Sequence, residues 1–390
     1  MEQRVNRVAL IDPVGKKAGM DHYDLLLLEG MAKNGLNVRL YSNFKDNGAA
    51  IKVIQAFYNH NTSKLQSVAG TISGFIRSLI SCRKEKTEWL ILHVFRAGVF
   101  DLFTFSLAKI LGFKICAIVH DIESLDTISL PFVRKMVIDN LPNIRVVHNE
   151  FSLQQLSKSI RPSSTTNTFV IPHVNFIHLF KHYQENPSTL DTIKHNKEFA
   201  NSIHEQLYDD LKKGVKIILF FGQIKNAKGL DTLLRAIAIT EGNYKLIVAG
   251  RVREGSWAQY EKTINELNIV HKMIPVIRFI TDEERDFLFS ISTIIVLPYT
   301  RIYQSGVLLM AMSFPKAVIA SDLSPNSEVV VTNENGMLFQ SGNIKQLSEK
   351  INVLLNDPVL CETISHSALK SVEKRFNPDI IGERFSEILK

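Results

Sequence analysis

VKIILFFGQIKNAKG, residues 215–229, is an apolar run followed by a turn between Gly222 and Gly229. The apolar run predicts a buried strand, and the apolar residues that recur at helical spacing after the turn predict an amphipathic helix. A glycine turn at a helix N-terminus gathers backbone N–H groups and the positive end of the helix dipole, and Lys228 adds a cation. Phosphate binds to such groups, so the stretch predicts an α/β domain with a diphosphate-binding turn.

The composition is that of a globular protein with two domains. The chain has 390 residues, of which 45% are hydrophobic and 22% charged, so two cores of ordinary size are expected rather than one. The net charge of +7 is compatible with nucleic acid or an anionic membrane as a partner. The basic residues are spread along the chain without a basic run interleaved with aromatic residues, which argues against nucleic acid.

Cysteine usage and the start of the chain predict a cytoplasmic protein. Cys82, Cys116 and Cys361 lie far apart and lack the spacing of zinc or redox motifs, which is typical of reduced thiols. The chain enters an expected strand at Val8–Ile11 without the apolar stretch of a signal peptide. No segment offers the roughly 18 uninterrupted apolar residues of a membrane span. We therefore expect the protein in the cytoplasm or at the cytoplasmic face of the membrane.

Strands and helices alternate twice along the chain, which predicts two doubly wound, Rossmann-like α/β domains. In the first half the expected strands are Val8–Ile11, Val38–Tyr41, Leu90–Val94, Ile115–Val119, Arg145–Val147 and Phe169–Ile171. In the second half they are Val215–Phe221, Tyr244–Ala249, Ile274–Arg278, Thr293–Leu297 and Ala317–Ala320. The expected organisation is an N-terminal domain over residues 1–180, a polar linker over 181–214 and a C-terminal domain over 215–375, with ligands bound beyond the carboxyl ends of the strands.

A second glycine-marked turn follows the expected strand Thr293–Leu297. Tyr299 comes soon after that strand, and Ser305 is a suitable N-cap for a helix that begins at Gly306. The absence of a side chain at Gly306 lets backbone amides approach a ligand. Two readings remain open for this turn taken alone: a second phosphate-facing helix start, or an ordinary capped helix.

The motifs of residues 215–345, taken in the order in which they occur along the chain, resemble the donor-binding domain of retaining glycosyltransferases of the GT-B fold (glycosyl transferases group 1). The resemblance implies two Rossmann-like domains that face a central cleft, and transfer of a hexose-type sugar from a UDP- or GDP-linked donor. It implies no cofactor besides the nucleotide sugar, and no metal. The residues that it implies for donor binding are Gly19, Gly222, Gln223, Lys228, Gly229, Arg251, Ile280, Tyr299, Gln304, Ser305, Gly306, Val307 and Met310.

The first half and the C-terminus add to the resemblance. Gly19 opens an expected helix that is similar to the family's first loop and helix, and His120, directly after Ile115–Val119, matches a histidine beside the donor sugar. The resemblance thus implies His120 and Lys228 as catalytic residues, and His22, Tyr23 and His173 as acceptor-side residues. His93 and His148 also end strands, and for them we favour a structural role. Residues 376–390 are similar to the terminal helix that returns to the first domain.

Three positions depart from the family pattern. Ile302 and Met310 stand where the family commonly has two glutamates, and a thioether accepts hydrogen bonds only weakly from the ribose hydroxyls. Gln223 stands where an arginine is expected, so it supplies hydrogen bonds without charge. A second hypothesis is therefore a non-catalytic subunit that binds a partner enzyme or a glycan. A sugar-nucleotide epimerase is a third, but it needs acid and base carboxylates that the sequence does not single out.

The acceptor is expected to be a glycan or a lipid-linked glycan, as in the synthesis of surface polysaccharides or glycoconjugates. The segment Lys64–Lys86 places apolar residues at helical spacing against basic residues. This pattern is compatible with a helix on an anionic membrane, and equally with a core-facing helix that has a basic end.

Overall fold

The computed structural model describes residues 6–17, 19–45, 48–58, 64–95, 97–122, 130–186, 203 and 205–390. These residues form two compact units: unit 1 comprises residues up to Val174 together with Phe376–Lys390, and unit 2 comprises Asn175–Arg375. The boundary before Asn175 lies upstream of the expected linker, residues 181–214, and part of that linker, residues 187–202, lies outside the described residues.

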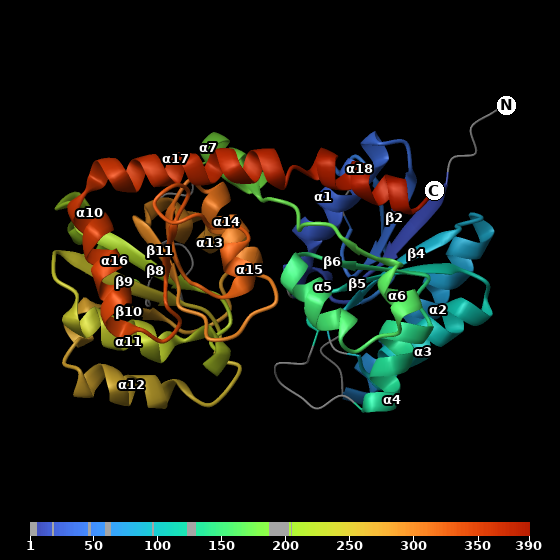
Figure 1. The fold of residues 1–390 in the computed structure, drawn as a ribbon, viewed down its shortest axis with the longest axis horizontal. Helices are drawn as coiled ribbons and strands as arrows, with labels where there is room; N and C mark the ends of the chain where they lie inside the picture. Colours follow the sequence, from blue (N-terminus) through green and yellow to red (C-terminus); the bar gives the residue numbers. More distant parts are fainter. Residues whose placement is uncertain are drawn as a thin grey trace. The chain divides into compact units, whose positions relative to one another are not determined.

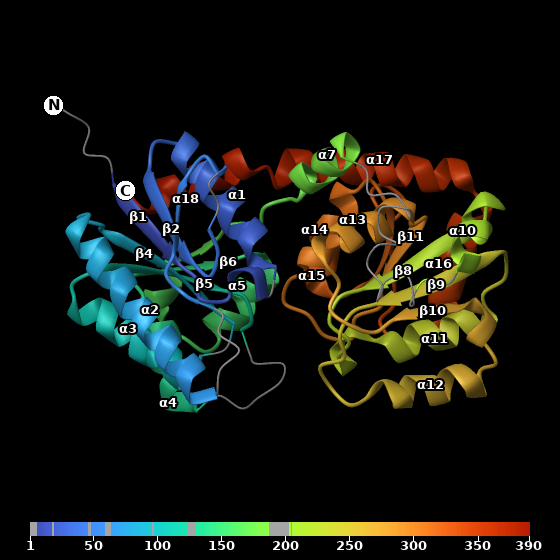
Figure 2. The same ribbon diagram turned by 180° about the vertical axis from the view of Figure 1, so that it is seen from behind.

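Unit 1 is built on a parallel sheet of seven strands in the order β3-β2-β1-β4-β5-β6-β7 (Figure 1). The strands are β1 (Arg7–Ile11), β2 (Asn37–Ser42), β3 (Lys52–Gln55), β4 (Trp89–Val94), β5 (Lys114–Val119), β6 (Ile144–Val147) and β7 (Thr168–Val170). The helices are α1 (Met20–Lys33), α2 (Lys64–Lys84), α3 (Val99–Ile110), α4 (Pro131–Arg134), α5 (Glu150–Ser157), α6 (Pro162–Thr165) and α18 (Pro378–Ile388). Figures 1 and 2 show α1 and α18 on one face of this sheet and α2 and α3 on the other.

The C-terminal helix α18 packs closely against α1. A Cβ atom added to Gly30 would lie 2.0 Å from the carbonyl oxygen of Pro378, and one added to Gly382 would lie 2.1 Å from the carbonyl carbon of Gly30. The two helices therefore meet backbone to backbone, which only glycine permits at both positions. Ile381 and Phe385 complete the core beneath α1, so the end of the chain is part of unit 1.

Unit 2 has a parallel sheet of six strands in the order β10-β9-β8-β11-β12-β13. The strands are β8 (Lys216–Phe221), β9 (Tyr244–Ala249), β10 (Met273–Val276), β11 (Ile294–Leu297), β12 (Ala317–Ser321) and β13 (Met337–Phe339). The helices are α7 (Ile177–Glu185), α10 (Glu205–Lys212), α11 (Leu230–Ile239), α12 (Trp257–Glu266), α13 (Asp282–Ile291), α14 (Gly306–Ser313), α15 (Ser324–Ser327), α16 (Ile344–Asn356) and α17 (Pro358–Arg375).

The order of strands in each sheet determines which loops lie beyond the carboxyl ends of the central strands. In unit 2, β8 and β11 are neighbours, and the chain reverses its direction of winding between them. This is the topological switch point at which ligands bind in doubly wound sheets. Both glycine-marked turns of the sequence follow these two strands. Unit 1 has its own switch point between β1 and β4.

Candidate functional site

In unit 2, the loop after β8 and the loop after β11 are hydrogen-bonded to each other. The backbone N–H of Thr300 donates to the carbonyl oxygen of Ala227 at 3.0 Å. Gly229, whose φ is +67°, caps the start of α11, and a Cβ atom there would lie 1.8 Å from the carbonyl oxygen of Pro298. Glycine is required here both by its backbone conformation and by the contact with the second loop.

Gly222 brings the first loop next to the start of α14. Its φ is +115°, and a Cβ atom there would lie 3.7 Å from Cγ2 of Val307. Behind it, a Cβ atom on Gly250 would lie 1.8 Å from the carbonyl oxygen of Gly222. Gly222 is thus held between the end of β9 and the first turn of α14, and its open side offers backbone to a ligand.

The N-terminus of α14 is capped in the way that the sequence predicts. The hydroxyl of Ser305 accepts a hydrogen bond from the backbone N–H of Leu308 at 3.1 Å and lies 3.5 Å from the hydroxyl of Tyr299. Gly306 is the first residue of the helix. The remaining N–H groups of the first turn and the helix dipole provide a site for an anion.

Lys228 is held against the second loop by an aromatic ring. Its Nζ lies 3.8 Å from the centroid of the Tyr299 ring, and Tyr299 is buried with 1% exposure. A cation over the face of an aromatic ring is attracted to it, by about 0.5–1 kcal/mol at an exposed site. The contact keeps the ammonium group of Lys228 beside the loop that leads to α14.

The other predicted donor residues differ in their exposure. Gln223 and Arg251 are exposed, and the guanidinium of Arg251 lies over the ring of Phe279 at 5.8 Å. Ile280 is buried, and Gln304 and Met310 are half-buried. Ile302, the first of the two positions without a glutamate, is buried with 7% exposure.

Unit 1 holds a cluster of four buried histidines around Tyr23. The ring centroid of Tyr23 lies 4.4 Å from that of His173 and 5.7–5.9 Å from those of His93, His120 and His148. The hydroxyl of Tyr23 is buried and has no hydrogen-bond partner among the described residues. The structure therefore brings together the predicted residues His120, Tyr23 and His173, and adds to them the two histidines expected to be structural.

Burial keeps all four histidine rings neutral at neutral pH. It lowers the pKa of His120 well below its usual value, with a further lowering from the neighbouring histidines, and it also lowers the pKa of His93. It lowers the pKa of His148 to about 3 and that of His173 to about 4. At pH 7 these rings act as neutral hydrogen-bonding groups rather than as cations.

Two buried aspartates beside this cluster did not stand out in the sequence. Asp12 follows β1, and its carboxylate accepts hydrogen bonds from the backbone N–H groups of Val14 at 2.8 Å and Gly15 at 2.7 Å. Burial, and next the charge of Asp24, raises the pKa of Asp12 to about 7. Burial raises the pKa of Asp24 well above its usual value. Oδ1 of Asp24 lies 2.8 Å from Nε2 of His93.

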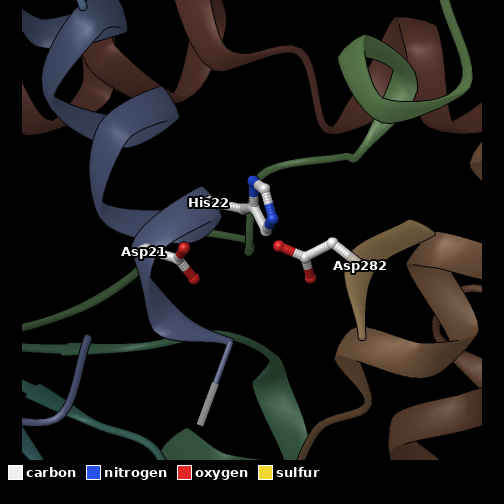
Figure 3. Close-up of side chains that lie close together, drawn as sticks. All are labelled: Asp21, His22 and Asp282. Atoms are coloured by element: carbon white, nitrogen blue, oxygen red, sulfur yellow. The ribbon is translucent and has the colours of Figure 1, made fainter. Parts of the chain in front are cut away.

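Gly19 and His22 lie at the start of α1. Gly19 is the N-cap residue with a φ of +70°, and a Cβ atom there would meet nothing within 4 Å. Figure 3 shows Asp21 and His22 on the first turn of α1, and also Asp282, the first residue of α13 in unit 2. Asp21 is buried, and His22 is half-buried.

A family comparison bears directly on the two loops of unit 2. Residues 207–371 match the family described as glycosyl transferases group 1. This part of the chain is similar to the glycosyl transferases group 1. The match spans both glycine-marked loops and most of unit 2.

The curated relatives are similar to only part of the chain. The chain is 27% identical over 198 residues to the capsular polysaccharide biosynthesis glycosyltransferase CapM of Staphylococcus aureus, which is 49% of this chain and 50% of that protein. It is 29% identical over 159 residues to an uncharacterized glycosyltransferase of Methanocaldococcus jannaschii, with 41% and 43% covered. The chain therefore spans about half the length, or less, of the curated relatives it matches.

Solved structures show the fold of the whole chain. Anabaena HepE in complex with UDP-glucose has a TM-score of 0.72 at 16% identity, with 98% of this chain and 99% of that chain covered. A sucrose-phosphate synthase from Thermosynechococcus elongatus has a TM-score of 0.71 at 19% identity, with 98% of each chain covered. These likenesses confirm the predicted GT-B fold class with two doubly wound α/β domains.

The described residues include no helix long and apolar enough to cross a membrane. The predicted amphipathic segment forms α2, which buries Phe75, Leu79 and Cys82 in unit 1 and leaves Val68, Ile76 and Ile80 exposed. Its inner face is thus that of a core-facing helix, while its outer face retains apolar side chains.

Proposed function

We propose that the protein is a retaining glycosyltransferase that takes a hexose-type sugar from a UDP- or GDP-linked donor. The observation that carries the proposal is the junction in unit 2, where the loop of Lys228 is hydrogen-bonded to the loop that leads into α14. The match to the glycosyl transferases group 1 spans both loops. HepE, whose fold this chain shares, was solved with UDP and with UDP-glucose, which supports a nucleotide sugar as the donor.

In this proposal the diphosphate binds to the backbone N–H groups at the start of α14 and to the ammonium group of Lys228. These groups stabilise the negative charge that develops on the leaving nucleotide. They take the role that a divalent cation has in other sugar transferases, so we propose a reaction without a metal or another cofactor. Gln223 supplies hydrogen bonds to the phosphates, and Arg251 and Gln304 complete the donor site from the neighbouring loops.

Unit 1 supplies the remaining groups. We propose that His120 contacts the donor sugar and that His22, Tyr23 and His173 face the acceptor. The acceptor is a glycan or a lipid-linked glycan, which the likeness to the capsular polysaccharide glycosyltransferase CapM supports. The exposed apolar side chains of α2 support a peripheral contact with an anionic membrane at the cytoplasmic face.

A second candidate function is a non-catalytic subunit that binds a partner enzyme or a glycan. The observation that favours it is the lack of carboxylates at Ile302 and Met310. A lost hydrogen bond to the ribose costs on the order of 1–3 kcal/mol, or about ten- to a hundredfold in affinity. This cost weakens donor binding without abolishing it, so the catalytic proposal is preferred.

Thermal unfolding of the full chain with UDP, GDP and their sugar conjugates separates the two candidates. A ligand at a hundred times its dissociation constant adds about 2.7 kcal/mol of stability. A catalytic protein is stabilised by one nucleotide family, and transfers radiolabelled sugar to a membrane or glycan fraction. A chain that no nucleotide stabilises has the function of a partner subunit.

A further inference from the structure

A cavity of about 530 Å³ lies in unit 1 at the carboxyl ends of β1 and β4, which is the switch point of its sheet. The residues at the ends of these two strands line one part of it, and α2, α3 and the start of α4 line the rest. Figures 1 and 2 show these three helices on the same side of unit 1. The volume of the cavity is within the range of about 300–1,000 Å³ that small-molecule sites occupy.

The floor of the cavity is hydrocarbon. Phe75 of α2, Leu92 of β4 and Phe105 of α3 line it and are only 1–3% exposed. Among the lining residues that the structure describes, four have polar side chains, and the others are apolar or glycine. The polar ones are Asp12, His93, Asp101 and Thr104.

The two polar side chains at the strand ends already have partners within the protein. The carboxylate of Asp12 accepts the two backbone N–H groups after β1 that are described above. The ring nitrogens of His93 lie 2.8 Å from Asp24 and 2.9 Å from His120. Both residues are therefore engaged by the protein itself.

The two polar side chains of α3 are engaged in the same way. The carboxylate of Asp101 accepts a hydrogen bond from the backbone N–H of Gly98 at 2.8 Å, and the hydroxyl of Thr104 donates to the carbonyl oxygen of Asp101 at 3.1 Å. A sugar ring carries many hydroxyl groups, and each one that is buried without a partner costs free energy. The cavity therefore suits a hydrocarbon chain better than a sugar.

The opening of the cavity is also apolar. Val99 and Leu130 line the cavity and are nevertheless 67% and 63% exposed. On the same helices, Phe103 and Phe132 are 41% and 68% exposed. Apolar surface thus continues from the cavity to the outside of unit 1, and contiguous exposed apolar surface marks sites for ligands, partners or membranes.

The outer face of α2 adds positive charge to this side of unit 1. Arg77, Arg83 and Lys84 are exposed there, together with the apolar side chains of Val68 and Ile80. Residues 64–84 include no aspartate or glutamate. Basic and apolar side chains without acidic ones complement an amphiphile that carries an anionic group on a hydrocarbon chain.

We propose that the cavity binds the hydrocarbon chain of a lipid-linked acceptor, so that the acceptor is an amphiphile rather than a free glycan. The proposal rests on the proposed function for the sugar transfer. Binding of the chain is a property of unit 1 alone and can be measured without a sugar donor. Isoprenoid and acyl chains share the chemistry that the lining recognises.

Calorimetric titration of the full chain with butyl, hexyl, octyl and decyl phosphate, each below its micelle concentration, tests the proposal. Each methylene that enters an apolar site raises affinity by up to about fourfold. We expect one saturable site, a gain of about two- to fourfold per methylene, and no comparable binding of inorganic phosphate. An affinity that does not depend on chain length, or no binding of decyl phosphate, overturns the proposal.

Ala97→Phe places a ring in the cavity, because Ala97 lines it and is 5% exposed. We expect the affinity for decyl phosphate to fall by about tenfold or more, since several methylenes lose their place. Ala69→Phe is the matched control. Ala69 is exposed on α2 and is not among the lining residues, so this variant is expected to bind decyl phosphate like the unaltered protein. Equal affinities for Ala97→Phe and the unaltered protein overturn the proposal.

Leu130→Ser decides the question if Ala97→Phe does not fold. Leu130 is largely exposed at the opening, so its replacement leaves the core of unit 1 intact. The variant loses apolar area that the chain contacts, and we expect a loss of about three- to tenfold in affinity for decyl phosphate. An unchanged affinity overturns the proposal.

Sugar transfer separates this inference from the proposed function. If both hold, the full chain transfers labelled sugar to a lipid-linked glycan, and decyl phosphate competes with that acceptor. Binding of decyl phosphate by a chain that transfers no sugar refutes the proposed function alone. Transfer to a free glycan without competition by decyl phosphate overturns this inference alone.

Discussion

Gly229→Ala is the substitution that most sharply tests the junction between the two loops of unit 2. A residue other than glycine at the φ of +67° costs roughly 1–2 kcal/mol. The added Cβ would also lie 1.8 Å from the carbonyl oxygen of Pro298, which is backbone and does not yield by a change of rotamer. One loop must move, and the hydrogen bond from Thr300 to Ala227 is lost at about 1 kcal/mol. The expected loss of stability is therefore about 2–3 kcal/mol.

Gly214→Ala is the matched control for this prediction. Gly214 is also in unit 2 and has a φ of +75°, but a Cβ atom there would meet nothing within 4 Å. This control carries the backbone cost alone, about 1–2 kcal/mol. The difference between the two variants isolates the contact with Pro298.

Thermal unfolding followed by tryptophan fluorescence can report on unit 2 selectively. The chain has two tryptophans, Trp89 in unit 1 and Trp257 in unit 2, so a Trp89→Phe background leaves one fluorescent probe in unit 2. We expect Gly229→Ala to lower the Tm of that probe by about 2–4 °C for each kcal/mol lost, and to weaken nucleotide binding beyond the effect of Gly214→Ala. Equal Tm values and equal nucleotide affinities for the two variants would refute the reasoning.

Three further predictions address single side chains. Lys228→Ala is expected to reduce nucleotide affinity at least tenfold with a Tm change of only about 1–4 °C, because its contact with Tyr299 is a single cation–π pair worth about 0.5–1 kcal/mol. Calorimetric titration with UDP and GDP checks this, and an unchanged affinity removes Lys228 from the site. Tyr23→Phe removes a buried hydroxyl without a described partner, so stability in urea is expected to hold or rise, whereas a loss of more than about 1 kcal/mol would show that the hydroxyl is satisfied. Burial lowers the pKa of His148 in the folded protein to about 3, below its ordinary value of 6.5, so the unfolded chain takes up the proton first and stability is lost as the pH falls below about 6.5. His148→Gln should therefore remove roughly 2 kcal/mol of the loss in unfolding free energy between pH 7.5 and pH 5. Urea unfolding that gives the same loss for the variant and the unaltered protein would contradict this.

The central strands were predictable because parallel strands buried on both faces are continuous apolar runs. Tyr244–Ala249 is the same in prediction and structure, and the other predicted strands differ by one or two residues at an end. The edge strands β3 and β13 were not predicted. β3 is a half-buried segment of four residues and β13 has three residues, so neither produces an apolar run long enough to stand out.

The site was predictable where backbone conformation demands a particular residue. Gly222, Gly229 and Ser305 could be assigned roles because a positive φ or a helix N-cap restricts the residue type. Asp24 could not be singled out, because it contacts the histidine cluster through His93, which is 69 positions away. One signal was present: Asp24 interrupts the buried stripe of α1 that continues three and four residues later at Leu27 and Leu28.

Crystals of the full chain soaked with UDP and with GDP test the central claim most directly. The account predicts that one of them binds in unit 2 with its diphosphate within hydrogen-bond distance of the first backbone N–H groups of α14 and of Nζ of Lys228. Diphosphate density away from both glycine-marked loops, in a crystal in which these loops are accessible, would contradict it.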